Sequence, residues 1–156
     1  MSHYTANLRD IQFCLFDLLG TEKILGTSVF SELDRETTMG MLDEMKRLTE
    51  NDLAASFVEG DRIGTDFNKA TGDVKLPESF KKSYKSYIDG EWWRIDTPVP
   101  LGGTKIPASV RWAIAEMVLG SNPSIHIYAS GYAFAHVAFM LGTDEQKHIA
   151  KLMVDR

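Results

Sequence analysis

The stretch from Asn122 to Arg156, NPSIHIYASGYAFAHVAFMLGTDEQKHIAKLMVDR, decides the fold of this chain. It predicts two helices that meet at a sharp corner. The asparagine that begins it is a favoured N-cap residue, and the proline that follows fits the first helical position. Gly142 ends this helix, and Thr143 opens the next one by forming a capping box with Gln146, three residues later.

The first of these two helices is predicted to be buried. Residues 124–141 contain no Asp, Glu, Lys or Arg, and apolar side chains occupy every side of the helix. A helix that is apolar all round is normally part of a core. The same run holds two His, two Ser, two Tyr and a Gly, so we expect a core helix and not a membrane span. One face repeats every fourth residue: Ile125, Ala129, Ala133, Val137 and Leu141.

The rest of the chain carries further helix signals. Helices are predicted at residues 7–19, 34–58, 77–90 and 107–119, where Asn7, Asp34, Pro77 and Pro107 are the start signals. Gly60 is expected to break the second of them. The polar segment 65–76 predicts a loop or a small hairpin, and segment 90–105 is irregular because prolines and glycines interrupt it. The fold class is therefore all-α, an orthogonal or up-and-down helical bundle.

Composition places limits on the function. A chain of 156 residues with 44% hydrophobic and 25% charged residues is typical of one soluble globular domain. A net charge of −5 argues against a nucleic-acid binder, which usually has a basic face. Arg9, Asp10 and Asp17 interrupt any signal-peptide pattern, and a single cysteine rules out an internal disulfide, so we expect a cytoplasmic protein.

The residues do not predict a self-contained catalytic site. No two of the four histidines are spaced i, i+4 on one helix, and no HExxH or CxxC motif is present, so a metal site is not expected. Cys14 has no neighbouring histidine or cation, which favours a buried, inert thiol. Lys81, Lys82 and Lys85 form a basic cluster, read either as a solvated face or as a phosphate-binding spot for coenzyme A.

Three parts of the chain resemble the N-terminal helical domain of the acyl-CoA dehydrogenases. The corner Gly-Thr-Asp-Glu-Gln-Lys at 142–147 is similar to the family's G-[TS]-x-E-Q-K corner. The loop Pro-Val-Pro-Leu-Gly-Gly at 98–103 resembles its PxxxGG loop, although it departs from the commoner PEEYGG. Residues 1–34 resemble the extension of one bacterial subgroup. This resemblance divides the chain into an extension helix at 1–34 and the family's domain at 35–156.

The resemblance implies a function for a larger protein. The family uses FAD to oxidise fatty acyl-CoA to trans-2-enoyl-CoA in fatty acid β-oxidation, and its flavin domain and catalytic glutamate follow the corner helix. This chain has neither, so it is expected to bind no FAD and to be inactive alone. The implied partners are fatty acyl-CoA, an electron-transfer acceptor, the flavin and C-terminal domains, and further subunits of a homo-oligomer. No nucleic acid or membrane span is expected.

The resemblance also places a substrate site on the first helix of the opening stretch. In the family this helix lines the inner end of the acyl pocket, and the matching positions here are Ile125, His126, Ala129 and Ala133. The small Ala129 implies a pocket open to longer acyl chains. For His126, a hydrogen-bonded core histidine is at least as good an interpretation as a substrate contact.

Two alternatives remain open from the sequence. The chain can be the N-terminal domain of such a dehydrogenase, or a free-standing helical interaction module that forms one half of a split enzyme. It stops at Arg156, where the family would run into a flavin strand, and this predicts a fragment, a proteolytic product or a deliberately shortened piece. The helix at 7–19 can dock on its own domain or contact another subunit.

Overall fold

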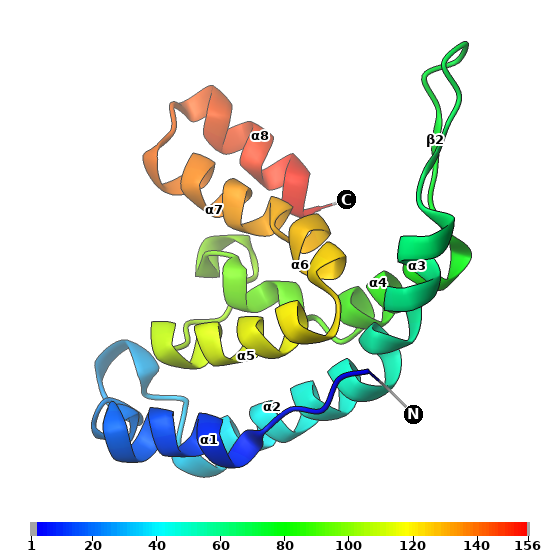
Figure 1. The fold of residues 1–156 in the computed structure, drawn as a ribbon. Helices are drawn as coiled ribbons and strands as arrows, with labels where there is room; N and C mark the ends of the chain where they lie inside the picture. Colours follow the sequence, from blue (N-terminus) through cyan, green and yellow to red (C-terminus); the bar gives the residue numbers. More distant parts are fainter. Residues whose placement is uncertain (1–2, 156) are drawn as a thin grey trace.

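The computed structural model describes residues 3–155 and arranges the helices around a core between α2 and α5 (Figure 1). The α-helices are α1 Leu8–Gln12, α2 Arg35–Leu48, α3 Phe57–Ile63, α4 Glu78–Asp89, α5 Ala108–Ser121, α6 Pro123–Ala129, α7 Gly131–Leu141 and α8 Asp144–Val154. Shorter helical turns are η1 Phe13–Leu18, η2 Thr21–Lys23, η3 Ser28–Phe30, η4 Thr49–Leu53, η5 Ala54–Ser56, η6 Trp92–Asp96 and η7 Val99–Leu101. The predicted all-α class is confirmed.

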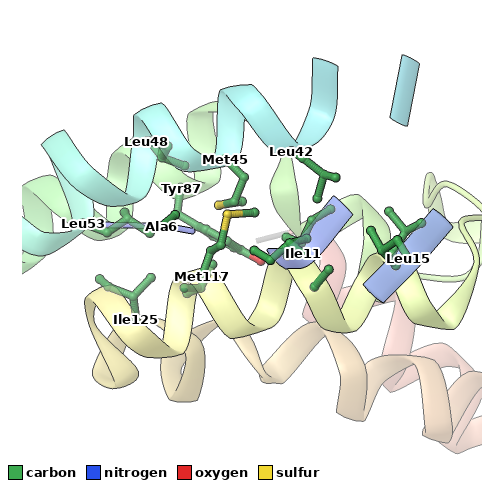
Figure 2. Close-up of a cluster of buried hydrophobic side chains, with 14 of the residues drawn as sticks. Ala6, Ile11, Leu15, Leu42, Met45, Leu48, Leu53, Tyr87, Met117 and Ile125 are labelled. Atoms are coloured by element: carbon green, nitrogen blue, oxygen red, sulfur yellow. The ribbon is translucent and has the colours of Figure 1, made fainter. Parts of the chain in front are cut away.

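The core is formed by side chains from elements far apart in the sequence (Figure 2). Leu42 and Met45 of α2 face Met117 of α5, and all three have no exposed surface. Ile11 and Leu15 of the N-terminal segment belong to the same cluster. Residues 3–34 therefore share a core with the rest of the described chain, and the helix predicted at 7–19 docks on its own domain.

The N-terminal segment follows the prediction at its start and departs from it later. Asn7 caps α1 by accepting a hydrogen bond from the backbone N–H of Asp10 at 3.4 Å. After α1 the chain widens into the π-helix η1, which shifts the following side chains around the axis. Leu15 is buried, whereas Leu18 near the end of this segment is 69% exposed. Cys14 is exposed, so the prediction of a buried thiol was wrong.

The long helix predicted at 34–58 is several helical pieces. Asp34 caps α2 as predicted, since its carboxylate accepts from the N–H of Thr37 at 2.7 Å. The helix then passes through η4 and η5 before α3 begins. Gly60 does not break the chain, because α3 continues to Gly64, whose left-handed φ of 67° ends it. This φ is one that glycine adopts without a steric cost.

The predicted hairpin is present in the segment after α3. Strands β1 Asp66–Phe67 and β2 Val74–Lys75 pair antiparallel, with Asp66 opposite Lys75 and Phe67 opposite Val74. All four residues are exposed, and the hairpin projects away from the helices (Figure 1).

The apolar helix predicted at 123–141 is two helices with different environments. It breaks at Ser130, where α6 ends and α7 begins. Ile125 and Ala129 of α6 are buried as predicted, but Phe134 of α7 is 66% exposed and Leu141 is 83% exposed. The α7–α8 pair stands above α5 (Figure 1), and nothing in residues 3–155 covers its outer side. The prediction of a buried helix was therefore wrong for most of α7.

The corner between α7 and α8 has the predicted chemistry. Gly142 is the C-cap of α7, and a Cβ atom added there would lie 2.3 Å from the carbonyl oxygen of Ala138. Thr143 and Gln146 form the capping box, in which the N–H of Thr143 donates to the Gln146 side chain at 2.8 Å and the Thr143 hydroxyl accepts from the Gln146 N–H at 3.4 Å. The corner thus fixes α8 against α7.

Asn122 has a different role from the predicted one. It precedes α6 but its side chain makes no capping hydrogen bond. Instead its Nδ2 donates to the carbonyl of Leu53 at 3.2 Å and to the hydroxyl of Ser56 at 3.0 Å, in a buried position. This amide ties the start of α6 to the turns that follow α2.

Replacing Asn122 by alanine is expected to lower the free energy of unfolding by about 1–3 kcal/mol, because two buried hydrogen bonds, to the Leu53 carbonyl and the Ser56 hydroxyl, are lost. Asn51→Ala is the matched control. The Asn51 side chain donates to the carbonyl of Arg47 at an exposed site, so its loss should change stability by less than about 0.5 kcal/mol. Urea unfolding followed by circular dichroism measures the stability of both variants. Equal losses of stability would contradict the role of Asn122 in tying α6 to the turns that follow α2.

Candidate functional site

The four predicted pocket residues do not converge on one open cavity. Ile125 and Ala129 are 0% and 3% exposed and belong to the core cluster. His126 and Ala133 are half-buried. None of the four lines the groove that the structure forms beside α6 and α7. Of these four residues, Ile125 and Ala129 thus face inward, and His126 and Ala133 lie nearer the surface.

The groove beside these helices lies between α4 and the α7–α8 pair. It has a volume of about 480 Å³, which is in the size range of small-molecule sites. Its lining contains no Asp, Glu, Lys or Arg, so it suits an apolar ligand and offers no carboxylate or ammonium group for acid–base chemistry. The lining residues are Tyr84, Ile88, Tyr128, Gly131, Tyr132, Ile149, Leu152 and Met153.

Aromatic contacts hold the walls of this groove in place. Tyr128 packs edge-on against Tyr84, with ring centroids 6.0 Å apart, and against Phe80 at 4.9 Å. Tyr132 stacks on Trp93 of η6 at 5.2 Å. Such pairs add to the stability gained from burial alone. They connect α4, α6, α7 and η6, so the groove is a structured surface.

The tyrosine hydroxyls are the polar side-chain groups of the groove. Burial raises the pKa of Tyr84, with a smaller contribution from Tyr132, and burial also raises the pKa of Tyr132. Both hydroxyls therefore keep their protons at neutral pH and can donate hydrogen bonds. His136 of α7 lies outside this lining, with its Nδ1 3.2 Å from the carbonyl oxygen of Asp96.

Sequence reasoning missed the aromatic wall. It took the small Ala129 as the sign of an open pocket, but apart from Gly131 the groove is lined by large side chains. A signal was available, because Tyr128 and Tyr132 are four residues apart and Tyr84 precedes Ile88 by four. The groove side of α8 shows the same spacing in Ile149, Leu152 and Met153.

A hydrogen bond within the loop before α5, from a side chain to a backbone carbonyl, holds its shape. Arg94 donates through Nη1 to the carbonyl of Gly102 at 2.7 Å, and Gly102 has a left-handed φ of 84°. Both adjacent tryptophans, Trp92 and Trp93, are half-buried. The loop thus supports the groove through Trp93 and carries no reacting group.

The basic cluster on α4 is largely neutralised. Lys81 pairs with Glu78 at 2.5 Å and Lys85 pairs with Asp89 at 2.7 Å, and all four side chains are well exposed. This is the arrangement of a solvated helix face, and it leaves little net charge to hold a phosphate group.

Residues 3–155 show neither a dinucleotide-binding sheet nor a cluster of metal-binding side chains. The sheet in residues 3–155 is limited to two strands of two residues each, without the strand-and-glycine cradle of a dinucleotide site. No group of three His, Cys, Asp or Glu residues in the same part is placed to hold a metal. No described helix is long and apolar enough to cross a membrane.

The comparisons with known proteins point to one family. No family model matches the chain. Over all 156 residues it is 46% identical to the broad-specificity linear acyl-CoA dehydrogenase FadE5 of Mycobacterium tuberculosis, of which it spans 26%. Over 121 residues, or 78% of the chain, it is 28% identical to the 3-methylmercaptopropionyl-CoA dehydrogenase of Ruegeria pomeroyi, of which it spans 20%. The chain thus spans about a quarter or less of either relative.

Proposed function

This chain belongs to the acyl-CoA dehydrogenase family and forms its N-terminal helical domain, and we propose that the enzyme of which it is a part oxidises linear fatty acyl-CoA. The observation that carries this proposal is the 46% identity to a broad-specificity linear acyl-CoA dehydrogenase over every residue of the chain. The reaction removes one hydrogen from Cα and one from Cβ of the acyl thioester and yields trans-2-enoyl-CoA. FAD accepts them in this family.

The role proposed for this domain is to form one wall of the acyl pocket. The α6–α7 pair supplies the predicted positions, with Ile125 and Ala129 supporting the wall from the core and His126 and Ala133 nearer its surface. The uncharged groove beside it continues this apolar surface. An apolar wall without acids or bases suits the alkyl end of a substrate, so the reacting carbons would lie elsewhere in the enzyme.

The exposed side of α7 supports the same role. Phe134, Val137, Met140 and Leu141 are each more than half exposed, and contiguous apolar surface of this kind marks a place where another part of a protein packs. We propose that the remaining domains of the enzyme cover it. We also propose that residues 1–34 are an extension added to the family domain at 35–156. Ala6, Ile11 and Leu15 of this extension belong to the same core cluster as α2 and α5.

The proposed reaction is tested with the complete enzyme. A fatty acyl-CoA should reduce an artificial electron acceptor in its presence, with trans-2-enoyl-CoA as the product by mass spectrometry. The 156-residue chain alone should show no turnover. A complete enzyme that leaves every linear acyl-CoA unchanged would exclude this function.

Placing a large side chain at Ala133 is expected to shorten the acyl pocket. In the complete enzyme, Ala133→Phe should lower kcat/KM for a 16-carbon acyl-CoA at least tenfold, or about 1.4 kcal/mol, and leave a four-carbon substrate unaffected. Ala108→Phe, at an exposed position of α5, is the control and should change neither. An equal fall for both substrates would place Ala133 outside the pocket.

A further inference from the structure

A second groove lies between the N-terminal segment and α5, away from the proposed acyl wall. Its volume is about 350 Å³. Ile11, Leu15 and Ala113 line it and are buried, so its floor is apolar. Leu19 and Trp112 line it as well and remain 62% and 57% exposed. Two large apolar side chains are thus exposed to solvent at the sides of an apolar groove.

Trp112 is the best anchor in this groove for another protein. Arg111 lies over its ring, 4.9 Å from the centroid, and Arg111 is itself paired with Asp96. The indole is therefore held on the surface beside a cation whose charge is already balanced. Exposed tryptophans beside an apolar trough are the residues that most often dominate binding energy at interfaces.

The groove also has an acidic rim. Asp10 lines it from α1 and Glu116 lines it from α5. Asp10 accepts a hydrogen bond from the Asn7 side chain at 2.6 Å, but no Lys or Arg among residues 3–155 forms an ion pair with either carboxylate. On the neighbouring helices α2 and α4, by contrast, several charged side chains are paired. The two rim carboxylates thus place unpaired negative charge beside the apolar floor of the groove.

We propose that this groove docks a basic amphipathic helix of a separate protein chain. A trough between two helices accepts a third helix, whose apolar side chains would cover Leu19 and Trp112. Lysine or arginine side chains on that helix would then reach Asp10 and Glu116 across the rim. The acidic rim repels nucleic acid and anionic lipid. A two-fold contact between copies of this chain, with its net charge of −5, brings the same carboxylates together.

A pair of designed peptides tests this proposal on the chain itself. The first is an amphipathic helix made of leucine and lysine, and the second carries glutamate in place of every lysine. Isothermal titration calorimetry should detect binding of the lysine peptide only. Charge reversal at the rim, in the double variant Asp10→Lys and Glu116→Lys, should weaken that binding at least tenfold. Both positions are exposed, and circular dichroism checks that the fold is kept.

The exposed face of α7 supplies the matched control, because it is apolar but does not line this groove. Phe134→Ser should leave the affinity for the lysine peptide unchanged. The proposal is overturned by equal binding of both peptides, by full affinity in the rim variant, or by loss of binding in Phe134→Ser. It is also overturned if sedimentation shows a dimer of this chain that the rim variant abolishes. None of these results depends on dehydrogenase activity, so the failure of one proposal leaves the other standing.

Discussion

Replacing Gly103 by alanine is expected to lower the free energy of unfolding by about 4 kcal/mol or more. A Cβ atom at this position would lie 1.6 Å from the carbonyl oxygen of Thr97 and 2.3 Å from its carbonyl carbon. Both are backbone atoms, so no side-chain rotation relieves the clash. The loop must open, and it would lose the hydrogen bond from the Gly103 N–H to the Pro98 carbonyl at 3.2 Å. Urea unfolding followed by circular dichroism measures the change.

Gly40 provides the matched control for this substitution. It lies inside α2, and a Cβ atom there would meet nothing within 4 Å. Gly40→Ala should therefore raise the free energy of unfolding by about 0.5–1 kcal/mol, because alanine loses less backbone entropy in a helix. The two substitutions are chemically identical and should act in opposite directions. A neutral Gly103→Ala would show that the loop is not closed around this glycine.

The features that the sequence predicted correctly are local ones. The caps at Asn7, Asp34 and Thr143 each depend on a hydrogen bond to a residue three positions later, and all three are present. The start of α5 was also predicted, since Pro107 is its start signal and the helix begins at Ala108. The family's Gly-Gly loop is likewise local, and the clash at Gly103 supplies its physical reason.

The features that the sequence could not predict depend on distant partners. Asn122 is a good N-cap by residue type, but Leu53 and Ser56 lie close enough to bind its amide instead. Residues 131–141 look like a core helix because they are apolar, and whether they are covered depends on what lies next to them. The tyrosine groove is assembled from α4, α6, α7 and α8, so no single stretch of sequence contains it.

Replacing Met117 by alanine is expected to lower the free energy of unfolding by about 2–5 kcal/mol. Its side chain has no exposed surface and packs between α2 and α5, beside Met45 (Figure 2). Truncation removes buried apolar area and leaves a cavity that surrounding helices fill only in part. Met140→Ala is the control, because Met140 is 59% exposed on α7 and its truncation should cost less than about 0.5 kcal/mol.

The same substitution tests how the chain is divided into folding units. Ile11 and Leu15 share the core cluster of Met117, so the backbone amides of α1 should lose hydrogen-exchange protection together with those of α2 and α5. The amides of α8 should change less, because α8 packs mainly on α7 and only Ala150 of its residues is buried. If α1 keeps its protection in Met117→Ala, residues 1–34 are an independently stable extension. Joint loss means that the N-terminal segment and the helices α2 and α5 fold as one unit.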